Sequence, residues 1–211
     1  MPGSIKIDDG SGNYTILTNA GSLGSDKTIT IPNETATIAT TTATDLGGLV
    51  KVAEGSTAGS SAIEVDNCFS STYKNYTIKY NFQKTGSGTA NFLILFRDGS
   101  GDVTGSNYDY KYMYSTTSST TWTTGANAAG QTSGILLFDG GPGYNYNLTM
   151  NIYEPNTTEE TSLTSYGSWK DGGHLLSAIS YDASTQLTGI TFKLSTGTLA
   201  GSYCIYGYRD S

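Results

Sequence analysis

The feature that most constrains the fold of this chain is a succession of short segments in which apolar and polar residues alternate with a period of two. Such alternation gives an extended strand one buried face, whereas an amphipathic helix needs apolar residues three and four positions apart. Clusters of Gly, Asn, Ser and Asp separate the segments and are typical of turns. No segment has convincing helical periodicity. The sequence therefore predicts an all-β fold.

Composition supports the same fold class. Only 14% of the 211 residues are charged and 27 are Gly, so residues that favour long helices are scarce. The 16 Tyr, 6 Phe and 2 Trp supply aromatic area for a core, which argues against a disordered chain. A hydrophobic content of 36% is low for a self-contained domain, which favours additional burial between copies of the chain.

Charge and targeting signals narrow the partners. The formal charge is -7 and the sequence pI is about 4.5, so we expect no nucleic-acid partner. No segment approaches the roughly 20 apolar residues of a membrane span, and residues 1–5 do not resemble a secretory signal, so we expect no membrane insertion. Cys68 and Cys204 have neither a disulfide framework nor metal-site spacing, and two reduced thiols are expected.

The chain divides into regions of different character. Four short alternating segments lie at 5–7, 14–17, 28–31 and 35–40, too sparsely apolar to form a core of their own. They favour a β-ribbon or shaft at residues 1–52 that becomes stable when several copies of the chain wrap around one another. The Gly/Ser-rich stretch at 53–61 predicts a hinge, because it offers almost nothing to bury.

The remainder, 62–211, predicts a head domain. Its turn clusters are spaced as in a β-sandwich, and a jelly-roll-like sandwich is expected. The expected strands are 62–69, 76–82, 90–96, 108–114, 134–138, 146–153, 162–169, 174–181, 189–194 and 202–208.

Two parts of the sequence resemble known proteins. The run from Thr28 to Thr40, with Ile-Pro-Asn-Glu-Thr at its centre, and Gly48-Leu49-Val50-Lys51-Val52 are similar to segments of bacteriophage tail and fibre proteins. Thr72 to Tyr76, Tyr108-Asp109-Tyr110 and the ending from Leu187 to Tyr208, with Thr-Gly-Ile and Ile-Tyr-Gly, resemble a phage structural module.

This resemblance implies a non-enzymatic virion protein, assembled in the bacterial host cytoplasm. It would be a short trimeric fibre that binds other virion proteins, of capsid or tail, through residues 1–52. Its outward head would contact a host surface glycan. The alternative is a capsid decoration or head-fibre protein with no receptor-binding role. The family implies no cofactor, metal or catalytic residue.

The most distinctive aromatic run is Tyr108-Asp109-Tyr110-Lys111-Tyr112-Met113-Tyr114. In an extended strand its four tyrosines, Tyr108, Tyr110, Tyr112 and Tyr114, share one face. That face is expected to lie in the core or in a trimer contact, with a glycan platform as the alternative.

Candidate glycan contacts are the aromatic and amide residues of expected loops, because exposed loops at the end of a sandwich often carry recognition. These candidates are Trp122, Tyr144, Asn145 and Tyr146.

Other chemistry is disfavoured. Asp98-Gly99-Ser100-Gly101-Asp102 is interpreted as a hairpin turn rather than a calcium loop, because it lacks a bidentate Glu. The single histidine, His174, has no Gly-x-Ser-x-Gly elbow to act on and is interpreted as a turn residue. Several carboxylates are present, but their spacing cannot be assigned from sequence to the pair that a glycosidase needs.

Overall fold

The computed structural model describes residues 4–8, 14–18, 48–116, 119, 121–169 and 172–209. The chain forms two units, Met1–Thr42 and Ala43–Ser211. In the first unit, β1 (Ser4–Asp8) and β2 (Tyr14–Thr18) pair as an antiparallel hairpin, with Ile5 opposite Leu17. The segments expected at 28–31 and 35–40 lie outside the described residues.

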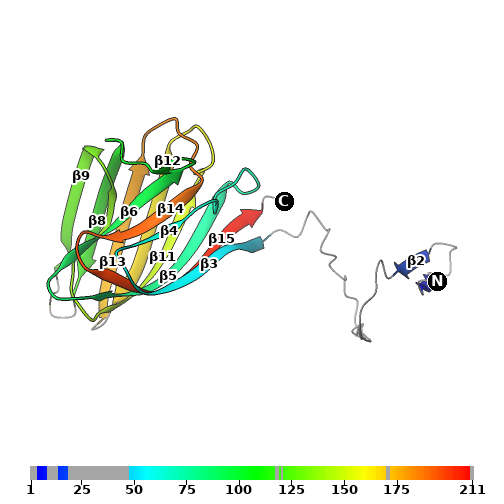
Figure 1. Cartoon of the computed structure of the whole chain (residues 1–211), viewed down its shortest axis with the longest axis horizontal. Coiled ribbons are helices and arrows are strands. Elements are labelled where there is room, and N and C mark those ends of the chain that lie inside the picture. The colour runs from blue at the N-terminus through cyan, green and yellow to red at the C-terminus, as the bar shows by residue number, and fades with distance from the viewer. Residues whose placement is uncertain are drawn as a thin grey trace. The chain divides into compact units, whose positions relative to one another are not determined.

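The second unit is an all-β sandwich of two antiparallel sheets (Figure 1). The described residues contain no α-helix. The large sheet has eight strands. In spatial order they are β3 (Gly48–Ser60), β15 (Thr198–Arg209), β5 (Asn75–Thr85), β11 (Asn145–Tyr153), β12 (Thr161–Trp169), β13 (Gly173–Tyr181), β8 (Tyr108–Ser115) and β9 (Thr123–Gln131).

The small sheet faces the large one and covers part of it. Its strands, in spatial order, are β10 (Gly134–Gly140), β6 (Ala90–Asp98), β14 (Gly189–Leu194) and β4 (Ala62–Val65), with β7 (Gly101–Asp102) paired to β6. The turn between β6 and β7 holds Asp98, whose carboxylate accepts a hydrogen bond from the Ser100 amide at 2.7 Å. The hairpin expected at 98–102 is therefore confirmed.

Aromatic rings fill the space between the sheets. Tyr80 of β5 stacks on Phe92 of β6 and Phe192 of β14, with ring centroids 5.5 and 4.4 Å apart. Phe82 extends the stack from Phe92 to Tyr146. Every second residue of β5 and β11 points into this layer, which is the period-two pattern of the sequence expressed in three dimensions.

A cationic side chain ties together the outer side of the small sheet. Arg97 of β6 is largely buried and donates hydrogen bonds to Asp66 at 2.7 Å and to Asp102 at 2.6 Å. A third carboxylate, Glu64, lies 3.1 Å from the same guanidinium. The planar fork of arginine suits several carboxylates at once, so this cluster joins β4, β6 and β7.

All strands expected between 62 and 211 are present, with small shifts of their ends. The expected hinge at 53–61 is wrong: residues 48–60 form β3, whose backbone pairs with β15 from Gly48↔Arg209 to Ser60↔Leu199. Gly and Ser are poor in core contacts, but an edge strand needs mainly main-chain hydrogen bonds. Residues 48–52, expected in the shaft, therefore belong to the sandwich.

Candidate ligand-binding groove

The outer face of the large sheet presents its side chains in rows across the strands. Directly paired residues lie about 5 Å apart, and successive rows on one face lie about 7 Å apart. We call one of these rows the lysine row. Its members are Glu54, Cys204, Lys79, Thr149, Tyr166, Leu176, Met113 and Thr124.

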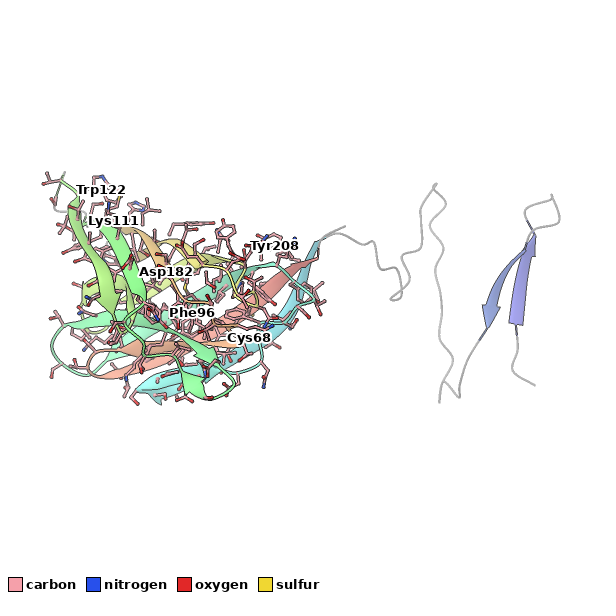
Figure 2. All side chains as sticks on the ribbon, turned by 90° about the horizontal axis from the view of Figure 1, so that it is seen from above. Cys68, Phe96, Lys111, Trp122, Asp182 and Tyr208 are labelled. Carbon is pink, nitrogen blue, oxygen red and sulfur yellow. The ribbon has the colours of Figure 1, made fainter. Side chains whose placement is uncertain are left out.

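The next row on the same face is almost entirely uncharged, and we call it the asparagine row. Its members are Ser56, Ser202, Asn81, Asn147, Ser168, His174 and Ser115. In Figure 2 the outer face of the large sheet is toward the top of the view. Lys111 and Tyr208, which also point outward, are labelled there, whereas Phe96 and Cys68 are labelled lower.

An open groove of about 670 Å³ lies over the middle of these two rows. This volume is within the range of small-molecule sites. Side chains that line it include Lys79, Tyr166 and Cys204 of the lysine row and Asn81, Asn147 and His174 of the asparagine row. Tyr206, from the row beyond Lys79, completes one side.

Hydrogen bonds between neighbouring strands orient the polar groups of the groove. The ammonium of Lys79 donates to the Thr149 hydroxyl at 3.0 Å, and the Asn81 amide donates to the Asn147 side-chain oxygen. Beyond the groove, Thr77 donates to the Asn151 side-chain oxygen at 2.6 Å and lies 2.8 Å from the Tyr208 hydroxyl. These contacts hold amides and hydroxyls in fixed positions while other donors and acceptors face outward.

The β3 edge beside the groove carries an ion pair. Lys51 and Glu54 lie 3.0 Å apart, and the hydrogen bond and charge of Glu54 raise the pKa of Lys51. The Cys204 thiol lies 3.9 Å from the Glu54 carboxylate. The interaction of Cys204 with the Tyr206 hydroxyl raises the pKa of Tyr206. Glu54 is thus engaged by Lys51 at the edge and is not among the residues lining the groove.

A second hollow, of about 640 Å³, adjoins the groove over β8, β9, β12 and β13. Its lining combines the apolar side chains of Met113, Ala126, Leu176 and Ala178 with Lys111 and two threonines. Leu176 is 49% exposed. The outer face of the large sheet is therefore less polar at this hollow than at the groove.

The structure places the expected aromatic face of β8 toward the interior. Tyr108 is fully buried, accepts a hydrogen bond from the Phe96 amide at 2.7 Å and donates to the Val103 carbonyl at 3.0 Å. Burial raises the pKa of its hydroxyl. Tyr110, Tyr112 and Tyr114 are half-buried and pack against the core, with neighbouring ring centroids 6.3 Å apart.

The four candidate glycan contacts do not form one site. Trp122 is 48% exposed and precedes β9, whereas Tyr144 precedes β11 and Asn145 is its first residue. These strands are four positions apart in the large sheet, about 19 Å at ordinary strand spacing.

One of the four, Tyr146, is wrong as a glycan contact. It is only 2% exposed, and its ring packs between Phe82 and Trp169. The reason is its register: Tyr146 pairs with Phe82 on the inward side of β11. Asn145, its neighbour, is exposed, and Tyr144 is half-buried with its ring centroid 6.5 Å from that of Tyr146.

Sequence reasoning missed the residues of the groove. Lys79, Asn81, Asn147, Thr149 and Tyr166 come from three strands, and none belongs to a motif. The alternation of residues along the strands could have indicated them. On β5 and β11 the residues that alternate with the buried ones are mostly Asn, Thr, Lys and Gln, which places a polar face opposite the core. His174, expected in a turn, lies within β13 and faces outward into the groove.

No family model, curated protein or solved structure matches this chain. Among the described residues, no helix is long and apolar enough to cross a membrane. The same part of the chain contains no cluster of three or more His, Cys, Asp or Glu side chains able to hold a metal ion.

Proposed function

We propose that this chain is a structural protein of a bacteriophage virion. In this proposal it forms a short homotrimeric fibre, attached to other virion proteins through its N-terminal segment, with a jelly-roll-like head that binds a host surface glycan. It is a binding protein and not an enzyme. The resemblance of 28–40 and of the chain's ending to phage structural proteins supports the virion role. Segments of that ending form β14 and β15, each of which lies between two other strands of its sheet.

The observation that carries the binding role is the groove on the outer face of the large sheet. Sugars present hydroxyls that pair with amides and hydroxyls, and ring faces that contact aromatic side chains. The asparagine row supplies the first kind of partner, and Tyr166, which is 51% exposed, supplies the second. The groove is open to solvent, which leaves room for a chain longer than the groove itself.

The composition of the groove favours binding over hydrolysis. A glycosidase of the usual kind needs two carboxyl groups flanking the scissile bond. Of the described residues that line the groove, none is Asp or Glu. Weak contacts by each head would instead add up through multivalency when three heads share one fibre.

The second hollow, over β8, β9, β12 and β13, supports the proposal that copies of the chain contact one another in a homotrimer. Exposed Leu176 and its neighbours Met113 and Ala178 offer apolar contact area beside Lys111. Sedimentation analysis of the full chain tests this part, with a single species of three times the chain mass as the expected result.

Adsorption of the full-length protein to host cells tests the binding role. We expect Tyr166→Ala to reduce adsorption about tenfold or more, because the exposed ring is lost without disturbing the core. Tyr153→Ala is the matched control: Tyr153 is also exposed on this face, but it does not line the groove.

Two results separate the alternatives. If virions carry the protein but neither they nor the purified chain bind cells or extracted surface polysaccharide, the decoration role replaces receptor binding. If deletion of residues 1–47 leaves incorporation into virions intact, the N-terminal attachment role is wrong.

A further inference from the structure

The charge of the groove is opposite in sign to the net charge of the chain. The whole chain has a formal charge of -7, yet the lining of the groove includes Lys79 and, among the described residues, no carboxylate. A protein of net negative charge repels anions over most of its surface. An anion is therefore attracted to a place where a lysine side chain lies without carboxylates beside it. The nearest acidic member of the lysine row, Glu54, lies beyond Cys204 and is paired with Lys51.

Lys79 is placed to meet a ligand. It lies on β5, near the middle of the large sheet, and its side chain is exposed on the outer face. Its ammonium donates one hydrogen bond, to the Thr149 hydroxyl at 3.0 Å. An ammonium has three N–H donors, so two remain available for an anionic oxygen.

The neighbours of Lys79 define the rest of the ligand. Tyr166 lies two strands away in the same row, about 10 Å by strand spacing, with Thr149 between them. Asn81 and Asn147 lie in the next row. A ring against Tyr166, hydroxyls at the amides and an acidic group at Lys79 are therefore compatible with one saccharide chain lying across the strands.

We propose that the glycan bound in this groove is anionic, and that Lys79 binds its carboxylate or phosphate group. This inference rests on the proposed function and adds the chemical class of the ligand. Both anionic groups present oxygens that a lysine ammonium binds as a point charge. Neutral glycans would leave Lys79 without its main partner.

A bacterial glycan array probed with the full-length protein tests the inference. The array carries neutral, carboxylate-bearing and phosphate-bearing saccharides, so that the two sources of the anion are distinguished. We expect binding to anionic glycans, weakened about tenfold by Lys79→Gln and reduced by 0.5 M salt. Lys193→Gln is the matched control, because it removes the same charge from an exposed residue of β14 in the small sheet.

A second measurement changes the ligand instead of the protein. Where the bound glycan bears a carboxylate, its reduction to an alcohol removes the charge and preserves the sugar chain. Where the glycan bears a phosphate, enzymatic dephosphorylation does the same. Titration calorimetry is expected to show about tenfold weaker binding of the neutral form to the wild type and little difference for Lys79→Gln.

The outcomes are distinct. Binding confined to neutral glycans, or anionic binding that Lys79→Gln retains in full, overturns the inference and leaves the proposed glycan-binding role standing. No binding to any glycan on the array, together with no adsorption to host cells, overturns the proposed role and the inference with it.

Discussion

At the scale of single residues, the same amino acid has opposite roles according to the face of the strand on which it lies. Tyr146 and Tyr166 lie on the neighbouring strands β11 and β12. Tyr146 points inward and is 2% exposed, whereas Tyr166 points outward and is 51% exposed. A shift of one residue in register would exchange the buried and exposed sets. Tyrosine content therefore indicates a β-rich protein but does not identify which rings are available to a ligand.

This contrast predicts different effects on stability. We expect Tyr146→Ala to lower the free energy of unfolding by about 3–5 kcal/mol, because it removes a large buried ring from the aromatic stack. Tyr166→Ala should change it by less than about 1 kcal/mol. Chemical denaturation of both variants measures the difference. Equal losses for the two variants would contradict the assignment of inward and outward faces.

At the scale of elements, β3 shows how weak a strand signal can be when main-chain pairing dominates. Its sequence, rich in Gly, Ser and Thr, predicts flexibility when considered alone. In the sandwich it is the outermost strand beside β15, and Val52 and Ala53 pack against the core. Gly55 leaves room for the Tyr203 side chain, whose hydroxyl oxygen would lie 2.7 Å from a Cβ at that position.

Truncation tests the role of β3. A chain lacking residues 1–47 should keep a cooperative unfolding transition close to that of the full chain, because the deletion stops before β3. A chain lacking residues 1–60 should be less stable and prone to aggregate, because β15 then becomes an unpaired edge. Thermal unfolding and size-exclusion chromatography measure both effects. Equal stability and monodispersity of the two truncations would show that β3 is dispensable.

At the scale of the whole molecule, burial gives the sandwich a characteristic response to alkali. Burial raises the pKa of the Cys68 thiol from 9.0 to about 12, and it raises the pKa values of Tyr80 and Tyr108 above 10.0. A group with a raised folded-state pKa favours the protonated, neutral form in the folded protein. Its contribution to stability is therefore complete below the unfolded-state pKa and is lost as pH rises toward the folded-state value.

We accordingly expect the melting temperature to fall steadily between about pH 9 and pH 12. Circular dichroism measures the melting, and absorbance at alkaline pH follows tyrosine ionisation. Exposed tyrosines should ionise first, and the buried ones only as tertiary structure is lost. Ionisation of all tyrosines near pH 10 with the fold intact would contradict the burial of Tyr80 and Tyr108.

Much of the strand content of the whole molecule could also be predicted from the sequence. Period-two alternation located the strands from residue 62 onward, because side-chain direction in a strand depends only on local geometry. It missed β9, whose run Thr-Thr-Gly-Ala-Asn-Ala-Ala-Gly-Gln has low strand propensity and lies at the edge of the large sheet. Propensity is a weak guide where pairing with one neighbour decides the conformation.

The sequence by itself determined the all-β class, most strand positions from residue 62 onward and the alternation of side chains between the two faces of a strand. Tertiary structure alone decided which strands are neighbours: β15, β5 and β11 adjoin in the sheet although residues 198–209, 75–85 and 145–153 are far apart in the chain. The groove exists only through that adjacency, since Lys79, Thr149 and Tyr166 meet across three strands. Local alternation fixes the direction of a side chain, whereas its neighbours on the face depend on long-range pairing that no local pattern encodes.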